Sequence, residues 1–397
     1  MSPQPALRVP IPACLKEPPI AAVLSAVPEA RIAGGAVRDI LAGRPVADID
    51  LATPRKPEQV MKALEAAGIR SIPTGLDHGT VTAVVDGRAF EITTLRRDIA
   101  TDGRHAVVAF TDDWEADAAR RDFSINAMSM TADGAVFDYF GGIADLRTGT
   151  VRFVGDPAQR IAEDYLRVLR FFRFFARYGA GAPDPSALAA IRNAVPHLAR
   201  LSAERVWNEL SRILAAPDPS AAVALMASLG VLAAVIPEGF DPAALDGLIA
   251  RSAPVDPLLR LAALLTGDPV AFATRLRLAN AERDRLVQLR TTPLAHPSDD
   301  DAALRRLLAD HDAESLIDCT WLEGGDGPEW RHLRQRLRET PRPVFPLAGR
   351  DVVELGVPPG PRVGDLLRTV RQWWLDGGCA ADATACRAEL ARLAAPS

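Results

Sequence analysis

The pattern of the sequence changes near residue 155, and this change limits the folds open to the chain. Before it, short β-branched runs such as residues 80–85 and 90–94 alternate with helix-like segments such as residues 58–67. Such alternation indicates a sheet with helices packed on it. After it, Ala, Leu and Arg recur at helical spacing, with Pro-containing breaks between segments. The sequence therefore predicts a mixed sheet with helices, followed by an all-helical region.

Composition narrows the class of protein. Hydrophobic residues make up 48% and charged residues 24% of the 397 residues, which excludes a wholly disordered chain. The longest apolar stretch, residues 221–236, is shorter than the about 20 residues that span a bilayer, so we expect buried helices there and no membrane association. No secretion signal is apparent at the N-terminus. The four cysteines show no metal-ligand spacing and fit a reducing, cytoplasmic location.

Two aspartates, Asp48 and Asp50, lie in a segment, residues 48–52, that reads as a strand. Residues i and i+2 of a strand project from the same face, so both carboxylates can converge on one site. Two like charges this close repel unless a cation lies between them, and hard oxygen ligands suit Mg²⁺. A polar turn after Pro45 is the simpler alternative. We predict Asp48 and Asp50 as catalytic, metal-binding residues.

A glycine pair, Gly34 and Gly35, precedes the aspartates and opens a helix-like run to Leu41. The backbone N–H groups of such a turn can hold a phosphate, and Arg38, one helical turn further, can add a guanidinium to the same anion. A glycine pair alone is more often only a turn. A phosphate cradle shortly before an aspartate pair nevertheless suits nucleotidyl transfer.

The same segments carry a family resemblance. Residues 34–43, followed by residues 48–53, resemble the first motif of the class II tRNA nucleotidyltransferases. This family contains CCA-adding enzymes and bacterial poly(A) polymerases and belongs to the DNA polymerase beta superfamily. Blocks similar to its further motifs follow in the family's order: residues 120–128, 138–146 and 163–173, with weaker similarity at 201–205 and 349–364.

The resemblance implies the fold class and the division of the chain. The fold is expected to be α+β, with a DNA polymerase beta-like nucleotidyltransferase head followed by an all-helical neck, body and tail. We expect a head or palm domain at residues 1–155, a neck that recognises the nucleotide base at 156–216, a helical body at 217–340 and a helical tail at 341–397.

The fourth block, residues 163–173, offers carboxylates beside guanidinium groups. An aspartate that accepts from an exocyclic amino group, with an arginine that donates to the ring nitrogen, selects C and A over G and U by about 1–3 kcal/mol per contact. The resemblance assigns Asp164 and Arg167 to this role, and Arg170 and Arg173 to further nucleotide contacts. A single helix would place these side chains on or beside one face. The alternative is a solvated face with ion pairs, which the neighbouring phenylalanines argue against.

Further residues complete the expected site. By resemblance, Arg121 contacts the incoming nucleotide, and we expect Gly35 and Arg38 to help orient the triphosphate and sugar. Asn126 is expected to cap or brace the neighbouring backbone. Glu91, on the expected strand, is a candidate third acidic group near the metals, although an exposed strand glutamate is the simpler interpretation.

The net charge of −5 requires any nucleic acid to be held by a local basic surface. Residues 160–215 supply one candidate, since they contain nine Arg against five Asp plus Glu. An ordinary Arg-rich helical surface is the alternative.

Together these features predict a CCA-adding tRNA nucleotidyltransferase. It would use CTP and ATP to add C, C and A to the 3′ end of tRNA without a nucleic-acid template, and release pyrophosphate. Mg²⁺ is the expected cofactor, tRNA with CTP and ATP are the expected partners, and no obligate protein partner is evident.

Three alternatives stay open. A bacterial poly(A) polymerase would use the same chemistry, but the chain ends without a basic tail. An enzyme that adds only CC or only A is disfavoured because residues 101–105, where the CCA-adding family has a loop that helps to switch from C to A addition, are all present. A non-catalytic RNA-binding relative would have no need for Asp48 and Asp50.

Overall fold

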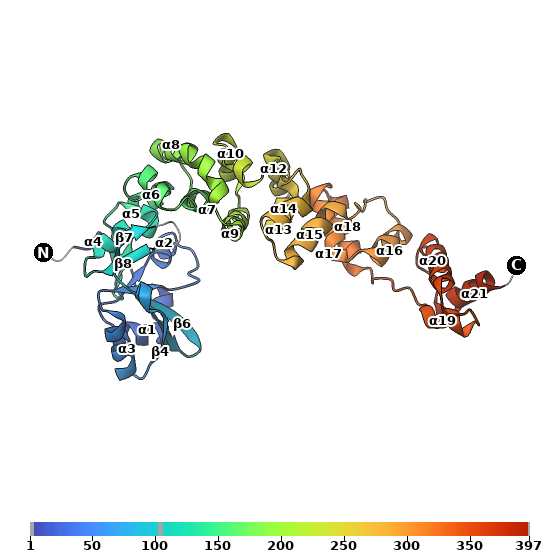
Figure 1. The fold of residues 1–397 in the computed structure, drawn as a ribbon, viewed down its shortest axis with the longest axis horizontal. Helices are drawn as coiled ribbons and strands as arrows, with labels where there is room; N and C mark the ends of the chain where they lie inside the picture. Colours follow the sequence, from blue (N-terminus) through green and yellow to red (C-terminus); the bar gives the residue numbers. More distant parts are fainter. Residues whose placement is uncertain (1–3, 102–105, 396–397) are drawn as a thin grey trace. The chain divides into compact units, whose positions relative to one another are not determined.

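The computed structural model describes residues 4–101 and 106–395. In Figure 1 the N-terminal part combines strands and helices, and all the labelled elements after α5 are helices. This confirms the predicted α+β class. The predicted loop at residues 101–105 lies largely outside the described residues. Around it, Arg96–Thr101 (β7) and Ala106–Phe110 (β8) pair as antiparallel strands, whereas the sequence indicated only a polar loop there.

An eight-stranded sheet forms the base of the N-terminal part, in the order β1-β10-β9-β2-β3-β6-β5-β4. Neighbouring strands run antiparallel except β3 and β6, which are parallel. The sheet is therefore mixed, as predicted. The strands are Leu7–Arg8 (β1), Arg31–Ala33 (β2), Leu51–Thr53 (β3), Arg70–Gly75 (β4), Thr80–Val85 (β5), Arg88–Thr94 (β6), Ser129–Met130 (β9) and Ala135–Phe137 (β10).

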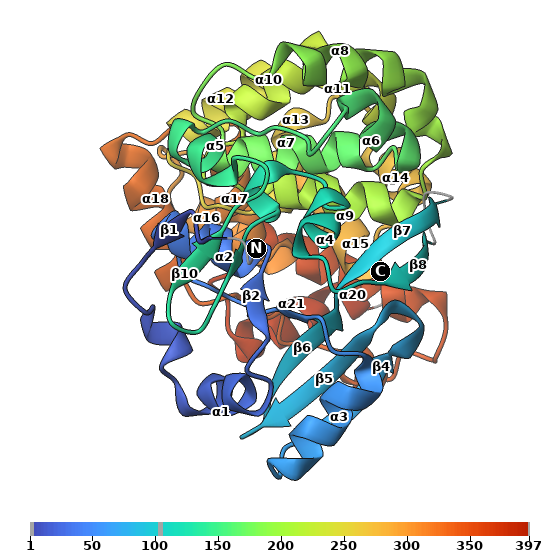
Figure 2. The ribbon, with the colours of Figure 1, turned by 90° about the vertical axis from the view of Figure 1, so that its left-hand side faces the viewer.

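Helices Pro18–Ala26 (α1) and Pro57–Ala66 (α3) pack against strands β4 to β6, and Figure 2 shows α3 running along these strands. Their inward residues, such as Ile20, Val60 and Leu64, join Val81 and Ile92 of the sheet in one buried core. Alternate residues of β5 and β6 point into this core because successive strand side chains face opposite sides. Three shorter helices complete this part: Gly35–Leu41 (α2), Trp114–Ala119 (α4) and Gly142–Thr148 (α5).

Asp-Pro pairs start many helices of the region that follows residue 155. Asp156, Asp184, Asp241, Asp256 and Asp268 each accept a hydrogen bond from a backbone N–H of the first turn, and a proline follows each of them. The aspartate satisfies an N–H that the helix leaves unpaired, and proline tolerates the first helical position because it has no N–H to lose. Several breaks expected from proline are therefore helix starts.

The chain separates into two compact units, the first ending at Pro237 and the second beginning at Glu238. The four-part division predicted from the sequence is finer and stays a prediction. The remaining α-helices of the first unit are Pro157–Glu163 (α6), Arg167–Tyr178 (α7), Pro185–Ala194 (α8), Ala203–Leu214 (α9), Ser220–Ser228 (α10) and Val231–Val235 (α11). The last two cover most of the apolar stretch 221–236. Its larger side chains, such as Val223, Met226 and Leu232, are buried, whereas Ala224 and Ala233 are exposed.

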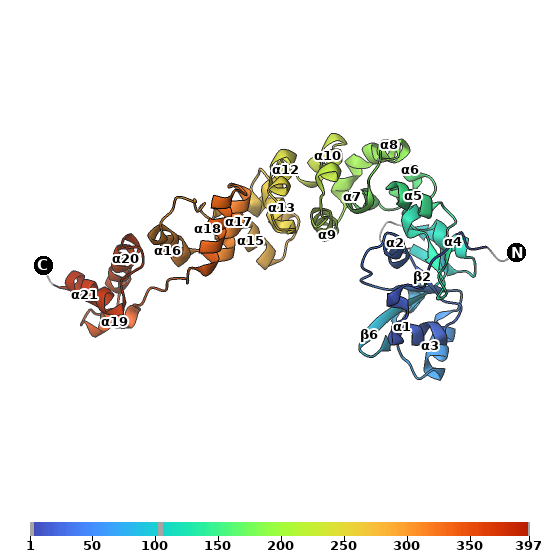
Figure 3. The same cartoon turned by 180° about the vertical axis from the view of Figure 1, so that it is seen from behind.

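The second unit is helical from Pro242–Ala250 (α12) to Ala383–Ala394 (α21). Its C-terminal helices Gly349–Glu354 (α19), Pro361–Asp376 (α20) and α21 enclose a small core of their own (Figure 3). Helix α19 thus occupies the first part of the segment 349–364, which is weakly similar to the family. The remaining helices are Pro257–Leu264 (α13), Pro269–Arg275 (α14), Asn280–Thr291 (α15), Asp301–Asp310 (α16), Ala313–Leu322 (α17) and Pro328–Glu339 (α18). Among the described residues, no helix is long and apolar enough to cross a membrane.

Candidate active site

A cavity of about 410 Å³ lies in the first unit and collects most of the predicted site residues. Gly35, Arg38, Asp50, Arg121, Asp164, Arg167 and Arg170 line it, whereas Asp48 and Arg173 do not. The lining also contains Gly34, Arg120, Asp122, Asn126 and Phe174. The cavity therefore joins the first, second and fourth sequence blocks, which are far apart along the chain.

The glycine turn sits against two arginines. Gly34 has φ 66° and ψ −123°, a conformation that L side chains rarely adopt. A Cβ at Gly34 would lie 2.8 Å from Arg121 Nη1, and a Cβ at Gly35 would lie 3.4 Å from Arg38 Nη2. The two guanidinium groups therefore approach the backbone of the turn closely, and glycine leaves the room for this approach.

The aspartate pair departs from the predicted strand geometry. Strand β3 begins only at Leu51, so Asp48 and Asp50 precede it, although the Ala33 N–H still donates to the Asp50 carbonyl at 2.9 Å. Asp48 and Asp50 are both exposed. The prediction that both project from a strand is wrong, because the strand expected from Asp48 begins three residues later, at Leu51. Asp50 alone lines the cavity.

Glu91 lies beside Asp50. In the parallel pair of β3 and β6, Leu51 faces Ile92, so the residues just before them are neighbours. The pKa of Asp50 is raised by the partial burial of the carboxylate and by the negative charges of Glu91 and Asp48, while Arg121 acts in the opposite direction. Mutual repulsion among hard oxygen ligands fits a divalent cation. Within residues 4–101 and 106–395, however, no three His, Cys, Asp or Glu side chains are already gathered as a metal site.

Arg38 is buried and held on several sides. Its Nη1 donates to Asn126 Oδ1 at 2.6 Å, and its Nε and Nη2 donate to the Asp39 carboxylate at 3.2 and 3.1 Å. The guanidinium carbon lies 5.1 Å from the ring centroid of Phe174 and 4.5 Å from that of Tyr178. These contacts fix the orientation of Arg38 before any ligand binds. Asn126 therefore orients this arginine rather than only bracing backbone.

Asp122 connects the second block to helix α7. It accepts from Asn126 Nδ2 at 3.1 Å, from the Phe123 N–H at 2.9 Å and from Arg170 Nε at 2.7 Å. Burial alone would raise the pKa of Asp122, but Arg170 and the hydrogen bonds hold it below its usual value. A continuous polar chain thus runs from Arg38 through Asn126 and Asp122 to Arg170.

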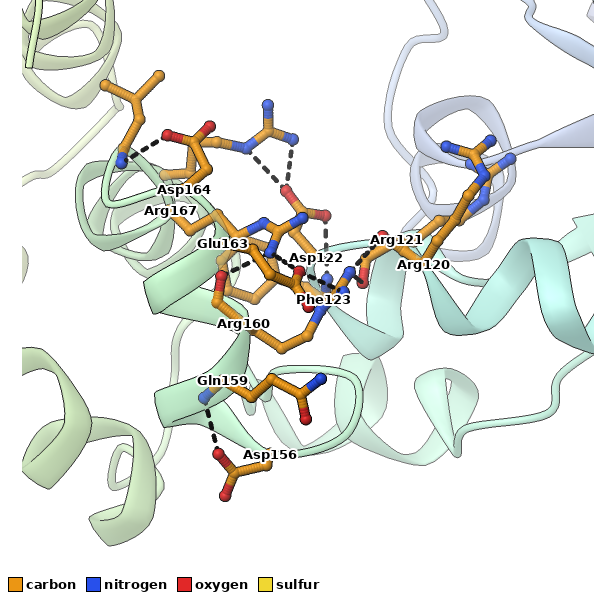
Figure 4. A network of polar contacts seen from close by, with 12 residues as sticks. Arg120, Arg121, Asp122, Phe123, Asp156, Gln159, Arg160, Glu163, Asp164 and Arg167 are labelled. Atoms are coloured by element: carbon orange, nitrogen blue, oxygen red, sulfur yellow. Dashed lines mark hydrogen bonds and ion pairs between the residues drawn. The ribbon is translucent and has the colours of Figure 1, made fainter. Parts of the chain in front are cut away.

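Arg120 and Arg121 share the buried carboxylate of Asp117, at 2.8 and 3.2 Å. Arg160 of α6 donates to the carbonyl oxygens of both arginines, at 2.7 Å for Arg121. Figure 4 shows Arg160 reaching from α6 toward the second block. The position of Arg121 is therefore set by α4 and α6 together.

The fourth block is not one helix. Helix α6 ends at Glu163, Asp164 has an extended backbone (φ −155°, ψ 106°), and α7 begins at Arg167. Asp164 Oδ1 accepts from the Leu166 N–H at 3.1 Å, which closes a local turn that competes with helix. The prediction of a single helix, with Glu163, Arg167 and Arg170 on one face and Asp164 and Arg173 at its edges, is therefore wrong, although Arg167 still pairs with Glu163.

The two predicted base-reading residues hold other partners, and Figure 4 shows Arg167 beside its partner Glu163. Asp164 Oδ2 accepts from Arg205 Nη2 of α9 at 2.6 Å. Arg167 Nη1 donates to the Glu163 carboxylate and to the Arg160 carbonyl, both at 2.5 Å. Both residues line the cavity, and the contacts of Arg167 come from one of its three nitrogens.

The other arginines of α7 are also paired. Arg170 bonds Asp122, as described above, and Arg173 Nη1 donates to Glu209 Oε1 of α9 at 3.0 Å. Arg173 is largely buried, and its carboxylate partner is buried too. Ion pairs on this face were the alternative weighed from the sequence, and they coexist with the buried phenylalanines.

Sequence reasoning missed the residues that position the site. Asp122 and Glu209 gave no signal because they pair with arginines distant in the chain, Arg170 and Arg173. Asp117 and Arg160 lie outside the recognised blocks, and their contacts with Arg121 appear only in the fold. Arg205 lies in the weakly similar segment 201–205, which was the only available sign of it.

Comparison with known proteins identifies the family. The family model of the poly A polymerase head domain matches residues 30–152, and that of the probable RNA and SrmB-binding site of polymerase A matches residues 182–241. The mitochondrial CCA tRNA nucleotidyltransferase 1 of Homo sapiens is 37% identical over 369 residues, which is 88% of this chain and 83% of the relative. The CCA-adding enzyme of Geobacillus stearothermophilus is 38% identical over 205 residues, covering 51% of this chain and 50% of the relative.

Solved structures give the same result. The Bacillus stearothermophilus CCA-adding enzyme in complex with CTP has a TM-score of 0.76 and 28% identity, and the match covers 95% of this chain and 98% of that one. The Thermotoga maritima CCA-adding enzyme complexed with tRNA has a TM-score of 0.62 at 20% identity, and the match covers 92% of this chain and 91% of that one. The second likeness concerns the fold alone.

Proposed function

The chain belongs to the CCA tRNA nucleotidyltransferase family, and from this premise we propose that its cavity adds C, C and A in turn to the 3′ end of tRNA. CTP and ATP are the donors and pyrophosphate is the product. One observation carries the proposal: a single cavity is lined by a carboxylate for a metal, by arginines for a triphosphate, and by an Asp and an Arg suited to a base.

Arg38 and Arg121 would orient the triphosphate. Both guanidinium groups face the Gly34–Gly35 turn, so a phosphate placed there meets two cations at once. Because Asn126 and Asp39 already fix Arg38, little side-chain entropy remains to be lost when the nucleotide binds.

Asp48 and Asp50 would hold two Mg²⁺ ions, with Glu91 as a neighbouring carboxylate. The pKa of Asp50 is raised first by burial and then by the negative charges of Glu91 and Asp48, and a divalent cation would neutralise that charge. When bound, the ions supply the charge that lowers the pKa of the primer 3′-hydroxyl and stabilises the departing pyrophosphate. The two aspartates would contribute by holding the ions in place, since nucleotidyl transfer depends on the alignment of the reacting groups and on charge neutralisation.

Asp164 and Arg167 would select the base. Asp164 can accept from the amino group of C or A while it keeps Arg205, because a carboxylate has about four acceptor positions. Arg167 retains Nε and Nη2 for a ring nitrogen. We infer that Arg170 contacts the nucleotide at the wall of the cavity. The ion pair with Glu209 favours a supporting role for Arg173. Variants of Glu209 and Arg173 decide whether Arg173 supports α7 or contacts the nucleotide.

The direct test supplies the protein with tRNA that lacks its last three nucleotides and with all four nucleoside triphosphates, and sequences the product ends. Addition that stops at CCA supports the proposal. A long A tail would identify a poly(A) polymerase instead, and a stop at CC or addition of A alone would identify a partial enzyme.

Alanine at the aspartates tests the metal assignment. Asp48→Ala or Asp50→Ala should abolish both C and A addition and leave tRNA binding largely intact, because each removes a charge that the reaction needs and neither is buried in the core. Single-turnover rates and a filter-binding assay give the two readouts. Wild-type-like turnover in either variant contradicts the assignment.

We also propose that the protein acts in a reducing compartment, the cytoplasm. The four cysteines are free thiols in the structure. The mammalian relatives are mitochondrial by name, so fractionation of cells that express the full chain is the appropriate test.

A further inference from the structure

A second cavity, of about 300 Å³, lies in the first unit next to the candidate active site. Tyr178, at the end of α7, connects the two. Its ring centroid is 4.5 Å from the guanidinium carbon of Arg38, which lines the first cavity, and 4.5 Å from that of Arg44, which lines the second. We call this second space the Arg44 cavity, lined by Leu7, Leu41, Ala42, Arg44, Ile143, Leu146, Arg147 and Tyr178.

The floor of the Arg44 cavity is aliphatic and firmly supported. Leu7, Leu41, Ile143 and Leu146 are partly buried and pack against the core of the head sheet. They come from β1, α2 and α5, so three separate elements maintain the shape of the cavity. The flat face of a nucleobase, or the face of a ribose ring that carries its C–H groups, fits such a surface.

The charged residues of the Arg44 cavity are all cationic, since its lining contains Arg44 and Arg147 and no carboxylate. The neighbouring carboxylates are already engaged: Asp39 binds Arg38 and Tyr178, and Asp145 binds Arg152 at 2.8 Å.

Arg44 is also oriented in advance. Its Nη2 donates to the Arg177 carbonyl at 2.7 Å while its guanidinium lies over the Tyr178 ring. Arg147 is exposed and has no ion pair within the described part of the chain. The exposed Arg177 is next to Tyr178 in the chain, which adds cationic charge near the same place. An anion that enters this cavity would meet positive charge, and no carboxylate of the lining would compete with it for the arginines.

We propose that the Arg44 cavity binds one nucleotide unit of the RNA substrate, with its backbone phosphate on Arg44 and Arg147 and its base or sugar on the aliphatic floor. This inference rests on the proposed function, which makes RNA the polyanion that the protein must hold. A protein of net charge −5 needs such local sites to bind RNA, and arginine suits phosphate because its planar fork donates two hydrogen bonds. A volume near the low end for ligand sites admits a single nucleotide and not a duplex.

The test compares three variants with the wild type in binding tRNA that lacks its last three nucleotides: Arg147→Gln, Arg44→Gln and the double variant. Each single change should weaken binding about 3- to 10-fold, and each lost phosphate contact should reduce the slope of log K against log salt by about 0.7. Arg147→Gln is the cleaner change, because Arg44 also contacts Tyr178, which touches Arg38.

Arg70→Gln is the matched control. It removes the same charge from an exposed position on β4, at the opposite edge of the same sheet from β1. It should leave affinity and salt slope unchanged. Lysine at both positions of the Arg44 cavity should restore part of the affinity, since the positive charge returns, and thermal unfolding of each variant confirms that the fold is kept.

Two results would overturn the inference. Unchanged tRNA affinity and salt slope in the double variant would mean that the cavity holds no RNA phosphate. A raised KM for CTP at saturating tRNA, with tRNA affinity retained, would mean that it serves free nucleotide instead. The proposed function is tested separately: it fails if the wild-type protein does not complete CCA ends.

Discussion

At the scale of single residues, the candidate site depends on side chains that share their partners. Asp164 bonds Arg205 and its own local turn while still lining the cavity, and Arg38 divides its donors between Asn126 and Asp39. Residues held in this way lose little freedom on binding, so they recognise a ligand by shape and by hydrogen-bond direction. Substitutions that keep volume and change only hydrogen bonding therefore test their roles most directly.

Asp164→Asn tests base choice. The amide keeps the volume but can turn its NH₂ toward a carbonyl oxygen such as O4 of uracil, so the preference for C and A should shrink by about 1–3 kcal/mol, or about 5- to 150-fold. Single-turnover rates for all four nucleotides on tRNA ending before the first C measure this change. Asp156→Asn is the control, because Asp156 caps α6 and asparagine caps equally well. Equal slowing of every nucleotide would show that Asp164 only positions α7.

Gly34→Ala tests the turn against the two arginines. The added Cβ would meet Arg121 Nη1 at 2.8 Å and would also require a strained backbone, so we expect a raised KM for CTP together with a loss of stability of about 1–2 kcal/mol or more. Gly43→Ala provides the comparison. Its φ is also positive at 64°, but no atom lies within 4 Å of its Cβ, so it should cost stability without raising KM. An unchanged KM in Gly34→Ala would remove Arg121 from the triphosphate site.

At this scale the sequence predicted residues that line the cavity better than the residues that support them. Gly35 and Arg38 belong to a turn whose chemistry can be read locally, whereas the family resemblance assigned Arg121, Asp164 and Arg167. Asp122 could not be recognised, because its role comes from Arg170, which is distant in the chain and reaches it only after α7 has packed.

At the scale of elements, α9 holds the fourth block in place. Arg205 bonds Asp164 and Glu209 bonds Arg173, so one helix supports both the turn before α7 and the body of α7. The turn itself could not be read from the sequence, because the segment contains neither Pro nor Gly. The helix ends there because the Asp164 side chain offers the Leu166 N–H a partner that replaces a helical one. Strands β5 and β6 and helix α3 were predictable, since alternation and helical spacing are local signals.

Two variants, Glu209→Leu and Glu209→Leu combined with Arg173→Met, decide whether Arg173 supports α7 or contacts the nucleotide. Alone, Glu209→Leu should destabilise the protein by up to about 3–5 kcal/mol, because it leaves the buried Arg173 without a counter-charge. Adding Arg173→Met should recover most of that loss. Urea unfolding measures both.

The double variant also reports function. If Arg173 only supports α7, KM for CTP in the double variant should stay near the wild-type value. A large rise in KM, with stability recovered, would instead make Arg173 a nucleotide contact, as the family resemblance implies.

At the scale of the whole molecule, much of the arginine excess in residues 160–215 serves ion pairs within the protein, which the composition did not reveal. Five of its nine arginines form ion pairs inside the first unit: Arg160, Arg167, Arg170, Arg173 and Arg205. Local charge counts therefore overstate the surface available to RNA. The Arg44 cavity lies outside that segment except for Tyr178, and a count by segment could not have found it.

The division into two units has a thermodynamic consequence. All lining residues of the candidate active site lie between Gly34 and Phe174, within the first unit. A ligand that binds only the native state stabilises what it binds, by about 2.7 kcal/mol at 100 times Kd. CTP with Mg²⁺ should therefore slow local opening in the first unit and leave the second unit unchanged, provided that the two units unfold separately.

Thiol labelling in mild denaturant measures the second unit, and hydrogen exchange of α7 and β5 measures the first. Cys319 and Cys386 are buried in the second unit, and burial raises the pKa of Cys319 to about 12, so both should label only after that unit opens. CTP should increase exchange protection in α7 without changing the labelling rates of Cys319 and Cys386. If thiol labelling slows by the same factor as hydrogen exchange, the two units unfold together, and CTP bound in the first unit also stabilises the second. In that case stability could not be assigned to either unit alone, and the stability cost of Glu209→Leu would describe the whole chain.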